Sequence, residues 1–94
     1  MRLIELLRSA SEWSDEDTTI YVAPEWSGNA EAILVTPAPD TTEPVVRDGR
    51  RYDYFLETFV AREVIEDYAS TAEGAHATEE ERCNRLIRYA QDDA

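Results

Sequence analysis

The sequence predicts an α+β fold: one small domain, residues 1–94, with helices packed on one face of a small antiparallel sheet in the order α-β-β-(β)-α-α. Three observations predict it. A chain of 94 residues has the length of a single domain. Its 43% hydrophobic content is sufficient for one modest core and well above that of disordered chains. Segments with helical spacing of apolar residues stand before and after segments rich in β-branched and aromatic residues.

The first element is a short amphipathic helix, expected over residues 2–11. Its apolar residues recur at helical spacing, and its charged residues lie mostly on the opposite side. These apolar residues are Leu3, Ile4, Leu6, Leu7 and Ala10. The acidic segment 14–18 ends the helix, because serine and aspartate side chains form hydrogen bonds with their own backbone.

Two strands are expected next, over residues 18–23 and 31–37, because both segments are rich in β-branched and aromatic residues. The turn-forming residues between them favour an antiparallel hairpin. Three of the four prolines lie in residues 37–44, which predicts an exposed loop there. A turn is expected at Asp48 and Gly49, and a short third strand at either 44–46 or 50–53.

The segment 52–70 is expected to be the longest helix and the spine of the domain. At about 100° per residue, its apolar side chains fall on two nearly opposite faces. One face carries Tyr52, Phe55, Leu56, Phe59 and Val60, and the other carries Tyr54, Ala61, Ile65 and Tyr68. A helix that is apolar on two sides is usually sandwiched between other elements.

A last helix is expected after a break at Gly74. Thr78 and Glu81 have the spacing of a capping box, in which each side chain bonds to the backbone N–H of the other. An apolar stripe follows at helical spacing. Its residues are Cys83, Leu86, Ile87 and Ala90.

The charge is strongly acidic. There are 21 acidic residues against nine basic ones, all arginine, and the formal net charge is -12. Residues 9–46 contain eight carboxylates and no basic residue. Such a field repels nucleic acid and anionic membranes and accelerates the encounter with a basic protein. Many acidic proteins use this balance for solubility alone, so both interpretations stay open.

Residue types needed for metal or nucleophilic chemistry are scarce. The single histidine, His76, and the single cysteine, Cys83, are too few for a zinc site. Cys83 lies on the apolar stripe of the last helix, where a cysteine usually behaves as a small buried hydrophobe. The three glycines are scattered, so there is no phosphate-binding loop. We therefore expect no metal, no cofactor and no enzymatic activity.

A cytoplasmic location is expected. One cysteine excludes an internal disulfide and fits a reducing compartment. Glu5 and Arg8 interrupt the N-terminal apolar segment, which therefore lacks the core of a signal peptide. No apolar run approaches the ~20 residues that a membrane-spanning helix needs.

A partner-binding surface is expected where aromatic residues stand among carboxylates, because interfaces are enriched in tryptophan and tyrosine. It forms a docking edge around the strand at 18–23. Glu63, expected to project from the main apolar face of the long helix, and Asp67 on its next turn join the same set. The full set is Trp13, Asp15, Glu16, Asp17, Glu25, Trp26, Glu63 and Asp67. In the alternative interpretation, both tryptophans cap the ends of the core with their N–H groups at its rim, and Glu63 pairs with an arginine or marks the core edge.

Three stretches carry a resemblance to known proteins. They are EDTTIYV after the leucine-rich first helix, YFLETFVAREVIEDY, and the ending ERCNRLIRYAQDDA. The chain resembles a family of small bacterial proteins of unassigned function. By size and charge it also resembles the immunity proteins of contact-dependent growth inhibition systems. That resemblance implies a cytoplasmic protein that binds and blocks one cognate toxin domain, often a basic nuclease, and it assigns no functional residue.

Three functional hypotheses follow. In the leading one, the chain is an immunity protein that covers the active-site cleft of a basic toxin domain, without contacting nucleic acid or membrane directly. In the second, it is a small adaptor or regulatory domain of bacterial origin. In the third, it is a small hydrolase that uses Glu63 and Asp67.

Overall fold

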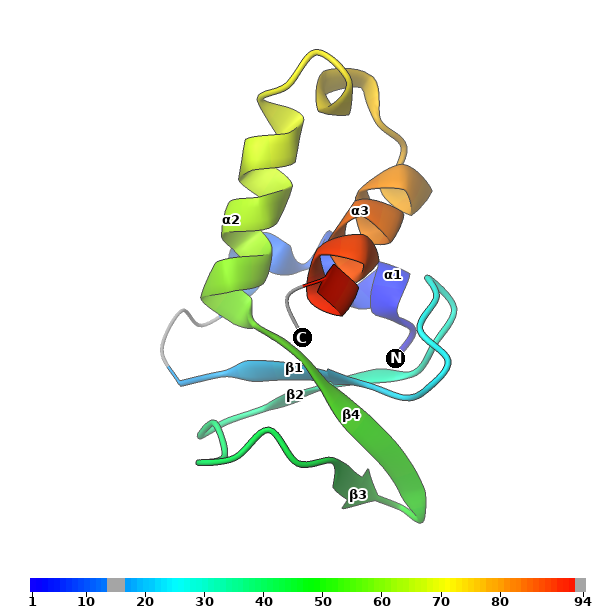
Figure 1. Ribbon diagram of the computed structural model, residues 1–94, viewed down its shortest axis with the longest axis vertical. Helices are drawn as coiled ribbons and strands as arrows, with labels where there is room; N and C mark the ends of the chain where they lie inside the picture. The colour runs from blue at the N-terminus through cyan, green and yellow to red at the C-terminus, as the bar shows by residue number, and fades with distance from the viewer. Residues whose placement is uncertain (14–16, 93–94) are drawn as a thin grey trace.

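The computed structural model describes residues 1–13 and 17–92. It confirms the α+β fold, with three helices on one face of a curled four-stranded antiparallel sheet (Figure 1). The strand order is β2-β1-β4-β3. The elements are α1 (Leu3–Arg8), β1 (Thr19–Val22), β2 (Ala32–Val35), β3 (Val45–Arg47), β4 (Arg50–Glu57), α2 (Thr58–Ala69) and α3 (Glu79–Asp92), with single 3-10 turns at Ala10–Glu12 and Gly74–His76.

Both positions considered for a third strand form strands. β3 and β4 pair as an antiparallel hairpin in which Arg47 lies opposite Arg50. The turn between them is Asp48–Gly49, as expected, and both residues have positive φ angles, 53° and 78°. Two successive positive φ angles match the twist of the flanking strands, which is why aspartate and glycine are favoured there. The hairpin formed by β1 and β2 is also confirmed.

The expected helix over 52–70 is wrong in its first third. Residues up to Glu57 belong to β4, and α2 begins only at Thr58. β4 pairs with both β1 and β3, and its pairing with β1 contains a bulge beside Phe55. The bulge brings Phe55 and Leu56, which are adjacent in sequence, into the same core beneath the helices. Two adjacent buried residues break strand alternation and produce a helix-like pattern in the sequence.

The core has two parts, one on each face of the sheet. The larger part lies between the sheet and the helices and includes Leu3, Ile20, Phe55 and Leu86. The smaller part lies on the other face and consists of Tyr21, Ala23, Val35 and Tyr52. The segment after β2 runs beneath this second face before it enters β3 (Figure 1).

The start of α3 forms as expected. The Thr78 backbone N–H donates to the Glu81 carboxylate at 3.0 Å, and the Glu81 N–H donates to the Thr78 hydroxyl at 3.1 Å. The first of these hydrogen bonds lowers the pKa of the Glu81 carboxyl. The apolar stripe of α3 is buried, and Cys83 within it is fully inaccessible to solvent.

Because Cys83 is buried, its thiol should react slowly with disulfide reagents. Desolvation, together with the nearby Glu80, raises the pKa of the thiol to about 11. A thiol that ionises there, instead of near its ordinary 9.0, has about 100-fold less thiolate at pH 8. We expect a disulfide reagent to react with the native protein at least about 100-fold more slowly than with the urea-unfolded chain. Equal rates in the two states would contradict the buried position.

Candidate functional site

The two tryptophans expected as exposed anchors belong to the core. Trp13 is 7% exposed, and its indole N–H is buried without a hydrogen-bond partner among the described residues. Trp26 is half-buried and donates its indole N–H to the Val22 carbonyl at 3.2 Å. Its ring meets Phe55 edge-on, with centroids 4.9 Å apart. The alternative interpretation is therefore correct in placing both tryptophans in the core, although the N–H of Trp13 does not lie at its rim.

The expected docking edge is wrong in its strand, because β1 does not lie at an edge of the sheet. β1 is a central strand, paired with β2 on one side and β4 on the other, and its four residues are all buried. Asp17 and Glu25 are both exposed, but they lie at opposite ends of this strand. Asp15 and Glu16 lie outside the described residues. The two described carboxylates that flank β1 therefore do not form one continuous patch along it.

The two α2 carboxylates are surface residues. Glu63 is exposed, so the expectation that it projects from the main apolar face of its helix is wrong. That expectation depended on a helix beginning near Tyr52, whereas α2 begins at Thr58 and buries Thr58 and Ala61. Asp67 is also exposed, and it lines a groove between α2 and α3.

A different set of carboxylates meets aromatic side chains at the end of the sheet where β4 passes into α2. Two adjoining hollows lie there, of about 200 and 460 Å³, and they share Ala38 and Glu57. We call them together the acidic hollow. Its charged and aromatic lining consists of Asp17, Asp40, Glu57, Tyr21, Tyr54 and Phe59.

The backbone explains why residues distant in sequence converge on this hollow. Glu57 lies opposite Thr19 across the β1–β4 pair. The first residue of α2, Thr58, donates both its backbone N–H and its hydroxyl to the Thr18 carbonyl, at 3.1 and 3.3 Å. These bonds hold Asp17 beside the junction of β4 and α2. From the other side, the segment after β2 contributes Ala38 and Asp40.

Arg62, on the second turn of α2, binds the end of the N-terminal helical region. Its guanidinium donates to the carbonyls of Ala10 at 2.7 Å and Trp13 at 2.8 Å. These carbonyls lie at the end of the N-terminal helical region, and that of Ala10 also accepts from the Trp13 backbone N–H at 3.3 Å. Arg62 thereby ties this region to the helix that carries Phe59.

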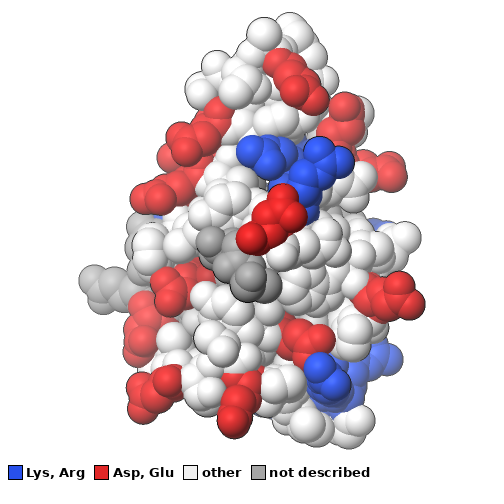
Figure 2. Space-filling view, viewed as in Figure 1, with Lys and Arg blue, Asp and Glu red and all other residues white. Residues whose placement is uncertain are grey.

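The carboxylates of the acidic hollow are not neutralised within the described part of the chain. Among residues 1–13 and 17–92, none of the ion pairs involves Asp17, Asp40 or Glu57. Figure 2 shows carboxylates along the α2 side of the molecule and across its lower part, while arginines gather over α3 and near the β3–β4 hairpin. Phe59, at 44%, is the most exposed aromatic side chain of the described residues. The hollow thus combines free negative charge with an accessible aromatic ring.

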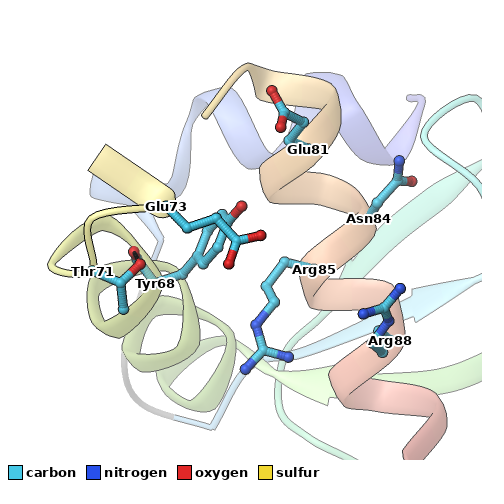
Figure 3. Close-up of a pocket in the computed structure, with 7 residues that line it drawn as sticks. All are labelled: Tyr68, Thr71, Glu73, Glu81, Asn84, Arg85 and Arg88. Carbon is cyan, nitrogen blue, oxygen red and sulfur yellow. Dashed lines mark hydrogen bonds between the residues drawn. The ribbon is translucent and has the colours of Figure 1, made fainter. Parts of the chain in front are cut away.

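A second groove separates α2 from α3, and its charge is mixed. Tyr68, Thr71 and Glu73 line one side, and Glu81, Asn84, Arg85 and Arg88 line the other (Figure 3). The Arg85 side chain extends from α3 toward α2, and Glu73 points into the space between the helices (Figure 3). An adjoining hollow adds Asp67 and Tyr89. Two arginines against three carboxylates do not make an anion-binding site.

Of the charged and aromatic residues that build the acidic hollow, the sequence indicates only Asp17 and, as an aromatic residue among carboxylates, Tyr21. The sequence predicts a helix at Tyr54, Glu57 and Phe59, which is correct only for Phe59, and it predicts a loop without a role at Asp40. The proximity of Phe59 to Glu57 in the sequence is a usable signal only once the start of α2 is known. Among the described residues, no three His, Cys, Asp or Glu side chains are arranged to hold a metal ion.

In the described part of the chain, no helix combines the length and apolar character needed to cross a membrane. The assignment of the acidic hollow as the candidate site depends on its geometry and charge. No protein-family model, curated protein or solved structure matches this chain.

Proposed function

We propose that this domain is a non-catalytic immunity protein. It binds a basic toxin domain, in the first instance a nuclease, and covers its active-site cleft with the acidic hollow. One observation carries the proposal: the most exposed aromatic side chain, Phe59, stands beside Asp17 and Glu57, which form no ion pair within the described residues. An aromatic anchor among unpaired charges is the composition of a binding surface.

The chemistry of the partner follows from this surface. A nuclease carries a positive cleft that receives phosphates, and the carboxylates of the hollow can take their place. The net charge of -12 accelerates the encounter, and the buried area around Phe59 slows release. Nucleic acid and anionic membranes are repelled by the same field, so the proposed partner is a protein.

The test expresses the C-terminal domain of the protein encoded next to this chain, which the proposal predicts to be toxic. We expect co-expression of the chain to restore growth of cells that make this toxin domain. The Phe59→Ala variant should bind it at least about tenfold more weakly, because hot-spot aromatics contribute this much or more. The Asp17→Asn variant should slow association about twofold to fivefold at low salt, and added salt should remove the difference.

Glu73→Gln provides the matched control, since Glu73 is an exposed carboxylate beyond the far end of α2. It should leave both growth and affinity unchanged. A neighbouring domain that is not toxic, or one that the wild-type chain fails to neutralise, would refute the proposed function, whereas unchanged affinity in Phe59→Ala would refute the acidic hollow as its binding surface.

A second candidate function is a small adaptor domain that binds through the groove between α2 and α3. The observation that favours it is the pair of half-buried tyrosines, Tyr68 and Tyr89, beside Arg85 in this groove. Binding that is insensitive to salt and to Phe59→Ala, but is lost in Tyr89→Ala, would identify this function instead.

A further inference from the structure

The larger part of the acidic hollow contains a buried polar atom without a partner. The side chain of Tyr21 is fully buried and lines this part, yet its hydroxyl forms no hydrogen bond with the described residues. Buried phenol groups usually have a partner, and each exception needs an explanation. The isolation of the hydroxyl is unfavourable in the free protein, and a ligand that supplies a donor would remove this penalty.

Aromatic and acidic groups line the part of the hollow that Tyr21 borders. The Tyr54 ring meets Tyr21 edge-on, with centroids 6.0 Å apart at an angle of 89°. Glu57 and Asp40 line the same space, Glu57 from β4 and Asp40 from the segment after β2. The volume of about 460 Å³ lies in the range of pockets that hold small ligands or single side chains.

We propose that this part of the hollow receives the guanidinium group of an arginine from the partner protein. The inference depends on the proposed function, because the arginine belongs to the basic domain that the acidic surface binds. The phenol oxygen of Tyr21 and the two carboxylates would accept its hydrogen bonds, and the half-buried ring of Tyr54 presents aromatic surface.

A guanidinium matches this lining better than other groups do. It has five N–H donors and no acceptor, bonds to carboxylates through two parallel N–H groups, and stacks on aromatic rings. A lysine ammonium has fewer donors and is more strongly hydrated. Phosphates and carboxylates are repelled by Asp40 and Glu57.

The direct test is an NMR titration of the full chain with N-acetyl-arginine amide. The backbone amides of Tyr21, Tyr54 and Glu57 should shift saturably. N-acetyl-citrulline amide, which has nearly the same shape without the charge, should cause no such shift. N-acetyl-lysine amide should bind about tenfold more weakly than the arginine compound, since it offers fewer hydrogen bonds in this geometry.

Tyr21→Phe removes only the hydroxyl and separates binding from folding. We expect it to weaken arginine-amide binding about tenfold, while its urea midpoint stays equal to or above that of the wild type. Asp40→Asn should weaken binding about threefold to tenfold without changing the midpoint. Tyr52→Phe is the matched control, because Tyr52 belongs to the same apolar cluster but does not line the hollow, and it should bind normally.

The outcomes distinguish this pocket from the proposed function. Unchanged arginine binding in Tyr21→Phe, or equal binding of citrulline amide, would overturn the pocket. If the toxin domain then still bound in a Phe59-dependent way, the acidic hollow would remain the docking surface, but without an arginine-binding pocket. Loss of toxin binding in Tyr21→Phe, together with loss of arginine binding, would support both.

Discussion

Replacing Phe55 with alanine should lower the free energy of unfolding by about 3–5 kcal/mol. Phe55 is 2% exposed, lies at the bulge of β4 and contacts the Trp26 ring edge-on. Its removal deletes a large buried ring and leaves a cavity between the sheet and the helices, which cannot close without moving β4. Urea denaturation followed by tryptophan fluorescence measures the loss.

Phe59→Ala is the matched control, four residues further along the chain. Phe59 is 44% exposed on the first turn of α2, so the same substitution should cost less than about 1 kcal/mol. A continuous helix over 52–70 would place both rings on one face, and the two losses would then be similar. Equal destabilisation would therefore contradict the strand-to-helix change at Glu57.

The difference between Phe55 and Phe59 separates the part of the fold that local sequence patterns predict from the part that they do not. The hairpins, the capping box at Thr78 and the buried stripe of α3 depend on neighbouring residues, and local patterns predict them. The conformation of Asp53–Glu57 depends on pairing with β1, whose partner residues lie 31 to 38 positions earlier in the sequence. No local pattern contains that information, and the bulge at Phe55 adds helix-like spacing to a strand.

The same limit applies to the candidate site. The composition indicates an acidic surface with aromatic residues, but not which aromatic residue is exposed. Trp13 and Trp26 belong to a residue type that is enriched at interfaces, but both pack in the core. Phe59 is exposed because it lies on the first turn of α2, which begins directly after β4 ends at Glu57. Asp40 and Tyr21 meet only because the segment after β2 returns beneath the sheet. Such contacts across the fold require the tertiary structure.

The second large effect concerns Gly74, in the turn between α2 and α3. A Cβ at this position would lie 1.8 Å from the Tyr68 carbonyl oxygen and 2.5 Å from its carbon. Both are backbone atoms, so no rotation of a side chain can relieve the overlap. Gly74→Ala should therefore lower the free energy of unfolding by about 2–3 kcal/mol, as overpacked buried sites do.

Gly28→Ala tests whether this loss comes from space rather than from the loss of a glycine. A Cβ at Gly28 would have its nearest neighbours, Cys83 Sγ and Ile4 Cβ, at 3.7 Å, an ordinary contact distance. This variant should be as stable as the wild type or more stable by up to about 1 kcal/mol, because alanine restricts the unfolded chain.

The Gly74 N–H also bonds to the Thr71 hydroxyl at 2.9 Å, which in turn donates to the Tyr68 carbonyl at 2.7 Å. Displacing this turn should move Tyr68 and Thr71, which line the groove between α2 and α3, while leaving the acidic hollow at the other end of α2 intact. Arginine-amide binding to Gly74→Ala, measured below its unfolding midpoint, should therefore equal that of the wild type, whereas reduced binding would show that the two ends of α2 are coupled.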